Sequence, residues 1–306
     1  FAELRDAGDR REGFLDPYTV LRDGPGVQAP AASAEDAAKE VKHVAKTFGA
    51  DLVGITGYDE RWVYTHNYSR EGEQEKVQEL PGDLGHVIVI AQSMDHGLIR
   101  TVPSALSGTA TGIGYSRDTV VLLALAQYLI NLGYRAVPTM NDTALAIPLA
   151  IKAGLGEYGR HGLLITKEFG PRVRLGKIFT DYPMAHDRPQ FFGVSKMCET
   201  CRRCTEACPA KAISGGDPND QVHNRSNIQG ITKWTTDAER CFRFWSNQNT
   251  DCSICVRVCP YNRTYDRWRD RVWRWLAGTP LRRIALWMDG RSGRGERQAP
   301  AGWWRV

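Results

Sequence analysis

The sequence of 306 residues has no cysteine outside two short segments, and this absence narrows its chemistry. The eight cysteines fall within 198–208 and 241–259. A chain of this length can bury a full hydrophobic core without disulfide bonds. Cysteines so close in sequence also pair poorly, because disulfide geometry restricts which Cβ atoms can meet. A disulfide framework is therefore disfavoured, and the two groups indicate metal binding.

The sequence also lacks features that are typical of membrane-spanning, nucleic-acid-binding and P-loop proteins. No apolar run approaches eighteen residues, and the longest, 120–130, is interrupted by Gln127, so we expect no membrane-spanning helix. The net charge of +5 and the lack of like-charge runs indicate no nucleic-acid tail. There is no P-loop motif and no signal peptide. The chain begins at Phe1 rather than Met, and we expect a processed or trimmed product from which a leader could have been removed.

The two cysteine groups have the spacing of iron–sulfur ligands. The stretch CETCRRCTEACP (198–209) follows C-x2-C-x2-C-x3-C-P, the bacterial ferredoxin pattern for a 4Fe–4S cluster, and the second group follows C-x10-C-x2-C-x3-C-P. In that pattern the cysteine before proline binds the other cluster. We predict that cluster one has the ligands Cys198, Cys201, Cys204 and Cys259, and that cluster two has Cys241, Cys252, Cys255 and Cys208. Two four-thiolate zinc sites are the alternative.

The first 190 residues lack cysteine and alternate between helical and strand patterns. Ser33 with Asp36 three residues later resembles a capping box, and the helix should end near Gly49. Apolar periodicity predicts an α/β or α+β domain. Its further predicted helices are 117–134 and 143–154, and its predicted strands are 51–56, 86–92, 135–139, 162–166 and 175–184.

Glycines gather in AGLGEYGRHG (153–162). The string at 154–159 matches G-x-G-x-x-G, but it follows a predicted helix and precedes a predicted strand, which is the wrong context for a dinucleotide site. These glycines allow tight turns and close approach of a flat or bulky group. An ordinary helix-to-strand loop is the alternative.

The segment 266–306 holds six of the nine tryptophans and ten arginines. Trp268, Val272, Trp275 and Leu276 fall on one helical face. We expect this tail to pack on the body, with arginine stems covering apolar surface. A helix lying on a membrane surface is the alternative.

Several segments resemble those of the corrinoid-dependent reductive dehalogenases and the related epoxyqueuosine reductases. Together they cover roughly 110–265, with a further match in the closing WW (303–304). They are GYS (114–116), LGYRAVPTMND (132–142), AGLGEYGRHGLLI (153–165), EFGPRVRLGKIFTDYPM (168–184), CFRFW (241–245) and the two cluster motifs.

The resemblance implies an α+β fold class, in which a nitroreductase-like, cobalamin-binding α/β domain is followed by a bacterial ferredoxin-like domain with two 4Fe–4S clusters. The expected boundaries are 1–190 for the corrinoid and substrate domain, 191–265 for the cluster domain and 266–306 for the tail.

The resemblance also implies a reaction in which a carbon-bound halogen is replaced by hydrogen, using cob(I)alamin reduced through the clusters. Tyr115 matches the proton donor, Asn141 an amide that orients the phenol or the halide, and Arg174 a cation that stabilises phenolate. Thr111 matches a residue beside the halide, and Trp245 an aromatic wall. The expected corrinoid contacts are Gly156, Tyr158, Arg160 and Gly162.

Each of these side chains also has an ordinary interpretation. Tyr115 could be a buried tyrosine with a satisfied hydroxyl, Asn141 a helix cap, and Arg174 a basic residue on an edge strand. The D-x-H-x-x-G signature of histidine-ligated cobalamin is missing, because Asp95 directly precedes His96. We therefore expect a base-off corrinoid and interpret His96 as an ordinary polar residue.

Two other functions compete. Epoxyqueuosine reductases use an aspartate in a segment that reads TATGIGYS (109–116) here, with no acid, and their basic helical repeats are absent. A cluster-only electron carrier would not need a domain of about 190 residues.

The resemblance implies a small organohalide substrate and an external electron donor (reduced ferredoxin, flavodoxin or a quinol chain). It also allows a membrane anchor protein and a homodimer, and no nucleic-acid partner is expected. It favours an exported, peripherally membrane-associated protein and leaves a cytoplasmic location open.

Overall fold

The computed structural model describes residues 21–31, 33–69, 74–78, 80–81, 83–224 and 226–305. Its centre is a four-stranded antiparallel sheet with the order β1-β4-β8-β5. The strands are β1 (Leu52–Gly57), β4 (His86–Ser93), β5 (Ala136–Thr139) and β8 (Val173–Thr180). Residues 87–92 of β4 are all buried, because helices cover both faces of the sheet.

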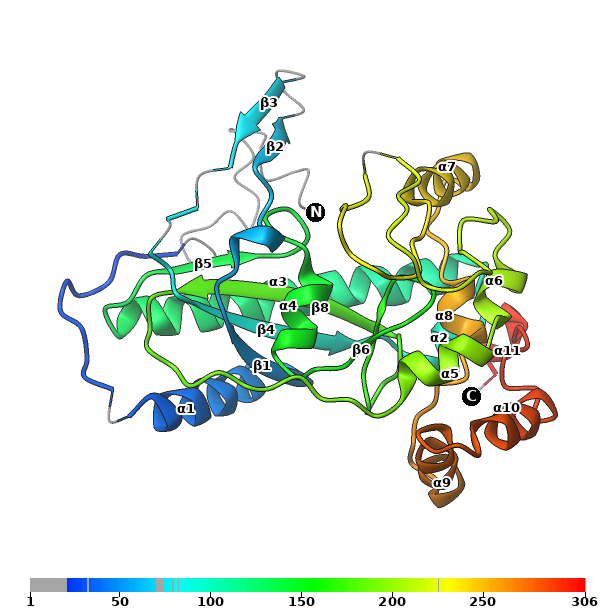
Figure 1. The fold of residues 1–306 in the computed structure, drawn as a ribbon. Helices are drawn as coiled ribbons and strands as arrows, with labels where there is room; N and C mark the ends of the chain where they lie inside the picture. Colours follow the sequence, from blue (N-terminus) through cyan, green and yellow to red (C-terminus); the bar gives the residue numbers. More distant parts are fainter. Residues whose placement is uncertain are drawn as a thin grey trace.

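Helices α1 (Ala34–Thr47) and α3 (Ala105–Asn131) cover one face of the sheet, and α4 (Ala146–Lys152) covers the other (Figure 1). Ile88 and Ile90 of β4 pack towards α1 and α3, whereas Val87 and Val89 pack towards α4. Alternate residues of the central strands therefore enter separate cores, which explains why β4 has a continuous apolar sequence.

Most predicted helices and strands of this domain are found, with three main differences. The strand predicted at 175–184 is β8 and ends at Thr180. The helix predicted at 117–134 begins at Ala105, where Ser104 forms a capping box with Ser107. Residues 105–116 contain three glycines and few large apolar side chains, so helical periodicity is weak there. Tyr115 therefore lies inside α3 rather than before it. The strand predicted at 162–166 is only β7 (Leu164–Ile165), which pairs with β6 (Glu157–Tyr158).

Three short elements complete this half of the chain. They are η1 (Glu60–Trp62), the hairpin of β2 (His66–Ser69) and β3 (Gln74–Val77), and α2 (His96–Arg100).

Four short helices carry the cysteine region, at the opposite end of the molecule from α1 (Figure 1). They are α5 (Val194–Thr200), α6 (Arg203–Ala207), α7 (Ala238–Gln248) and α8 (Ile254–Val258). Helices α6 and α8 pack against each other, and a Cys-Pro pair follows each of them. The two cysteine motifs thus have the same local structure and face one another.

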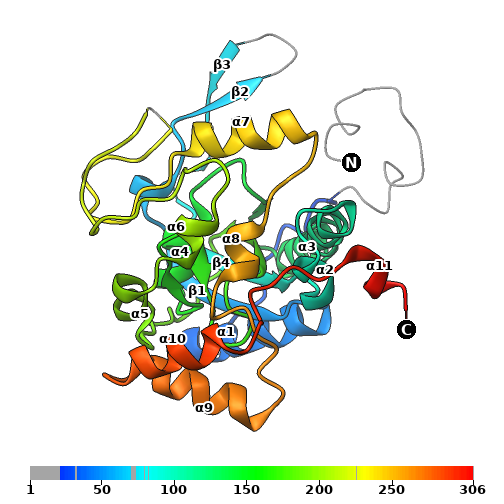
Figure 2. The ribbon, with the colours of Figure 1, turned by 90° about the vertical axis from the view of Figure 1, so that its right-hand side faces the viewer.

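The tail forms α9 (Trp268–Ala277), α10 (Arg282–Gly290) and α11 (Pro300–Trp303). Figure 2 shows α9 and α10 side by side beneath the cluster region. The tail packs on the body through Trp273, which is 3% exposed, whereas Trp268 and Trp275 of the face noted in the sequence are each 65% exposed. The Trp273 Nε1 donates to the Ala285 carbonyl at 2.8 Å and thereby joins α9 to α10. No helix within the described ranges is long and apolar enough to cross a membrane.

Candidate active site

The structure brings Tyr115, Asn141 and Arg174 together from three different elements. Tyr115 lies on α3, Asn141 in the bend after β5, and Arg174 near the start of β8. The Asn141 Nδ2 donates to the Tyr115 hydroxyl oxygen at 2.7 Å. The Arg174 Cζ lies 4.0 Å from the centroid of the Tyr115 ring. Sequence reasoning placed the cation beside the phenol oxygen, whereas the contact found here is with the ring face.

A glycine creates the space for this contact. A Cβ atom at Gly114 would lie 2.7 Å from the Arg174 Cγ, so the arginine stem passes where any other residue would place a side chain. Burial lowers the pKa of Arg174, and Asp251 nearby opposes this. An arginine remains charged despite such a shift. The three residues therefore combine a phenol, an amide donor and a fixed cation.

Thr111 lies one helical turn before Tyr115, and its hydroxyl donates to Asp251 Oδ2 at 2.6 Å. Asp251 directly precedes Cys252, so this bond joins the α3 segment that carries Tyr115 to the cluster region. Sequence reasoning missed Asp251, because its partner is 140 residues away. The hydroxyl proton of Thr111 is already bonded, which leaves the oxygen lone pairs and the methyl group available to a neighbour.

Trp245 lies on α7, one helical turn after Cys241. Its buried indole N–H is directed at the Cys241 thiol, where it favours the thiolate, and its carbonyl accepts from the Thr250 amide at 3.4 Å. The structure thus places Trp245 next to a cluster-two cysteine and the 250–251 loop. Its role as a wall of the substrate pocket stays a prediction.

The four thiols assigned to cluster one line a single cavity, together with His161, Met197, Pro260 and Tyr261. Burial raises the pKa of the Cys198 and Cys204 thiols to about 12, so each is protonated unless a positive centre stabilises the thiolate. Iron supplies that charge. Four such thiols around one cavity suit a metal cluster.

The thiols assigned to cluster two are also neighbours. Burial, together with the nearby Cys252 and Cys208, raises the pKa of Cys241 to about 11. Cys255 is surrounded by the same thiols and by Cys204 of the other group. Within the described part of the chain, no three His, Cys, Asp or Glu side chains converge closely enough to hold one metal ion. Four neighbouring thiols can bind either a zinc ion or an iron–sulfur cluster.

His161 was missed by sequence reasoning, although it lines the cluster-one cavity. Its Nδ1 accepts from the Leu163 amide at 3.2 Å, and burial lowers its pKa to about 4, so the ring is neutral. The proton then belongs to Nε2, which is buried and has no partner in the protein. An N–H in this cavity can donate a hydrogen bond to a cluster sulfur.

We expect His161→Phe to lower the reduction potential of cluster one. Hydrogen bonds to cluster sulfurs favour the reduced, more negative cluster, and phenylalanine removes the donor but keeps a flat ring. An EPR-monitored redox titration measures this, with the exposed His43→Phe as the control. An unchanged potential in His161→Phe would show that Nε2 does not reach the cluster.

The four predicted corrinoid contacts each have a partner inside the protein. A Cβ at Gly156 would lie 2.3 Å from the Ile165 carbonyl oxygen, and one at Gly162, where φ is +77°, would lie 2.8 Å from Thr236 Oγ1. The Tyr158 hydroxyl donates to the Trp234 carbonyl at 3.1 Å. These contacts join the glycine segment to the cluster domain, and a corrinoid contact stays a prediction.

Arg160 is 1% exposed and lies beside Cys198. Its guanidinium donates to the carbonyls of Cys198, Ser214 and Gly216, and it stacks on the Trp234 ring at 4.8 Å. Its donors are thus largely used inside the protein, so the structure gives it a role in holding the Cys198 loop.

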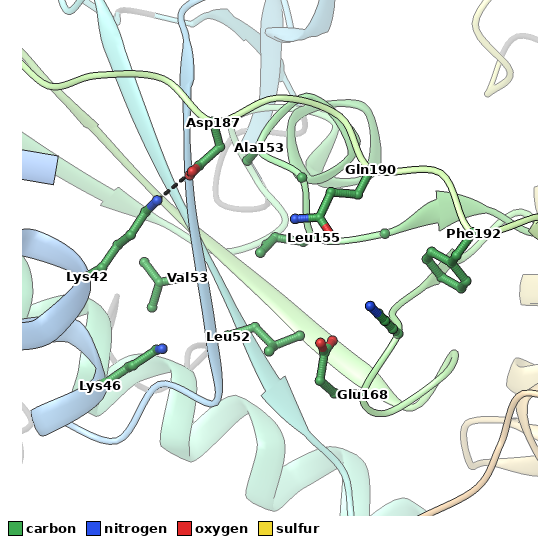
Figure 3. A pocket seen from close by; sticks show the side chains of 13 residues that line it. Lys42, Lys46, Leu52, Val53, Ala153, Leu155, Glu168, Asp187, Gln190 and Phe192 are labelled. Carbon is green, nitrogen blue, oxygen red and sulfur yellow. Dashed lines mark hydrogen bonds and ion pairs between the residues drawn. The ribbon is translucent and has the colours of Figure 1, made fainter. Parts of the chain in front are cut away.

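A separate cavity of about 300 Å³ lies at the β1 edge of the sheet, whereas Asn141 follows β5 at the other edge. Figure 3 shows Lys42 and Asp187 paired at its mouth, with Lys46 on the same helix. Of the predicted site residues only Gly156 lines it. This cavity is therefore not part of the Tyr115 group.

Two family models match the chain. Residues 67–184 match the family described as reductive dehalogenase subunit, and residues 197–262 match the 4Fe-4S double cluster binding domain. The first match contains Tyr115, Asn141 and Arg174, and the second contains all eight cysteines.

Individual relatives agree with these matches. The tetrachloroethene reductive dehalogenase of Desulfitobacterium hafniense is 38% identical over 295 residues, covering 84% of this chain and 53% of the relative. The epoxyqueuosine reductase of Lactococcus garvieae is 32% identical over 131 residues, covering 40% of this chain and 34% of the relative. The chain spans about half the length of the dehalogenases it matches.

The fold is similar to that of solved structures. A reductive dehalogenase structure that suggests a mechanism for B12-dependent dehalogenation superposes with a TM-score of 0.77 and 25% identity, covering 90% of this chain and 39% of that one. The predicted fold class, a mixed α/β domain followed by a ferredoxin-like double-cluster domain, is therefore confirmed.

Proposed function

We propose that this chain, which belongs to the reductive dehalogenase family, replaces a carbon-bound halogen by hydrogen, with Tyr115 as the proton donor. The observation that carries the proposal is the group of Tyr115, Asn141 and Arg174, which the Thr111–Asp251 hydrogen bond links to the double-cluster domain. The substrate class is a small organohalide, as the names of the relatives suggest.

The hydrogen bonds of Tyr115 leave its proton available. The phenol oxygen accepts the hydrogen of Asn141 Nδ2, so the hydroxyl hydrogen can point to a substrate carbon. The guanidinium over the ring attracts the electron-rich phenolate more strongly than the phenol. Both contacts thus stabilise the species that remains after proton donation, which is what a general acid requires.

A bound corrinoid supplies the electrons that break the carbon–halogen bond. Thr235 and Thr236 have buried hydroxyls without a partner in the protein, and Thr236 lies beside Gly162. Such hydroxyls can bind the amide side chains at the edge of a corrin ring, so the residues present fit this cofactor. The sequence lacks the motif that places a histidine on cobalt, and we propose a base-off state.

We propose that two clusters deliver electrons to this site. We propose that cluster one is held by Cys198, Cys201, Cys204 and Cys259, and that the other four cysteines hold cluster two. An external donor, such as reduced ferredoxin, flavodoxin or a quinol chain, reduces them. The family resemblance also supports a membrane anchor protein, a homodimer and an exported location as parts of this proposal.

The experiment is anaerobic purification with cobalamin supplied, followed by a halide-release screen with reduced methyl viologen. We expect halide release that needs both the corrinoid and the donor. An epoxyqueuosine reductase activity would instead appear as reduction of an epoxyqueuosine-containing tRNA stem-loop without halide release. A cluster-only carrier would show no corrinoid absorption bands after the clusters are bleached.

A further inference from the structure

A fully buried lysine lies behind the amide that contacts Tyr115. Lys177 is on β8, its side chain is 0% exposed, and its Nζ donates to the carbonyl of Met140. Met140 directly precedes Asn141, whose Nδ2 donates to the Tyr115 hydroxyl. Lys177 therefore contacts the backbone next to Asn141, and Asn141 contacts the phenol of Tyr115.

The strand register explains how the lysine reaches this carbonyl. Lys177 is the Cα partner of Thr139, the last residue of β5. The chain then leaves the sheet in the bend 140–143, where the Met140 amide donates to Asp142 Oδ1 at 3.2 Å. Asn141 itself is exposed, so the packing of its own side chain does little to fix its position. The bend is held by Lys177 on the carbonyl of Met140 and by Asp142 on its amide.

Two carboxylates balance the buried charge. Burial lowers the pKa of Lys177 to about 8, and Asp142 in the bend and Asp118 on α3 oppose this. Asp118 is 0% exposed, neither of its oxygens has a hydrogen-bond partner, and burial raises its pKa to about 7. The other charged or imidazole groups on the helices and strands packed against β8 have partners of their own: Arg117 pairs with Asp51, Lys152 with Asp59, and His86 with His186.

We propose that Lys177 is a positioning residue for the proposed dehalogenation: its ammonium group holds the 140–142 bend so that Asn141 stays on the Tyr115 oxygen. This inference rests on the proposed function of Tyr115. A buried lysine costs free energy unless its charge is used, and an apolar residue of similar length would fill the same space. The free-energy cost of burying Lys177 is explained if its positive charge holds the 140–142 bend in place.

The proposal predicts a particular pH dependence. The ammonium form, which donates the charge-assisted hydrogen bond, is present below the pKa of about 8 and is lost as the pH rises through it. The turnover number kcat of the cobalamin-loaded protein should therefore fall across that range. In Lys177→Met we expect kcat to be about 10-fold to 100-fold lower, with KM little changed. The fall of kcat at high pH, which is the basic limb of the pH profile, should disappear in this variant.

Asp118→Asn gives a second, independent result. Removing this carboxylate lowers the pKa of Lys177, so the basic limb should move to lower pH while kcat at pH 6.5 stays within about twofold. Lys152→Met is the matched control, because it removes a lysine of the same domain that binds Asp59 and not the bend. Its pH profile should equal that of the unmodified protein.

Hydrogen–deuterium exchange of the segment 136–144 tests the contact without turnover. We expect faster amide exchange at 140–144 in Lys177→Met than in Lys152→Met, with unchanged iron content. If Lys177→Met keeps both the basic limb and slow exchange, the proposal is overturned. A protein that releases no halide under any condition would overturn the proposed function alone, and the exchange result would still decide whether Lys177 holds the bend.

Discussion

Tyr115→Phe should release halide about 10² to 10⁴ times more slowly than the unmodified protein, the usual contribution of a general acid. The substitution keeps the ring on which Arg174 lies and removes the hydroxyl that Asn141 contacts. Corrinoid and iron contents should not change. Halide release with reduced methyl viologen, at saturating substrate, is the measurement.

The control is Tyr128→Phe, a tyrosine on the same helix whose hydroxyl contacts Glu40 and not this site. It should leave halide release unchanged. If Tyr115→Phe works at the unmodified rate while a solvent isotope effect shows that proton transfer limits turnover, the proton comes from water or another residue. The proposed role of Tyr115 would then be wrong.

Arg174 should show a graded effect. Arg174→Lys keeps a positive charge near the Tyr115 ring but loses the flat guanidinium, so we expect a smaller loss of halide release than in Arg174→Ala. Equal losses in the two variants would mean that stacking, rather than charge, is what the ring requires.

Cys204→Ala should remove about four of the about eight irons per chain, because it removes one ligand of cluster one. The expected result is loss of one EPR signal, retention of the other, and unchanged corrinoid binding. Halide release should fall below detection with any donor that delivers electrons through cluster one.

The matched variant is Cys255→Ala, which should remove the other signal. The crossed assignment predicts further that Cys259→Ala resembles Cys204→Ala, and that Cys208→Ala resembles Cys255→Ala. If Cys259→Ala instead removes the signal that Cys255→Ala removes, the ligands do not cross. About two bound zinc ions in place of iron would contradict the clusters altogether.

Sequence periodicity predicted the sheet and most helices because they bury regular apolar faces. It failed at residues 105–116, where glycines replace large side chains. The same glycines serve the site, since Gly114 makes room for Arg174 and Gly108 lies against Asp251. The glycines that weaken the helical periodicity of this segment are therefore the same ones that let Arg174 and Asp251 approach α3.

The cysteines and the Tyr115 group could be predicted because their spacing and residue types resemble a known family. Asp251, His161 and Lys177 could not, because each acts through a contact with a residue distant in sequence or through burial. In the tail, too, the sequence alone does not show which side chains are buried. The sequence pattern singled out the face of Trp268 and Trp275, whereas the buried tryptophan is Trp273, which packs against Tyr261.

The most direct measurement of the central claim is turnover in deuterated water with a non-exchanging organohalide, following halide and product together. The account predicts one halide released and one deuterium found at the dehalogenated carbon for each two electrons consumed, with the yield lost in Tyr115→Phe. Electron consumption without halide release, or a dehalogenated product that carries no solvent deuterium, would contradict it.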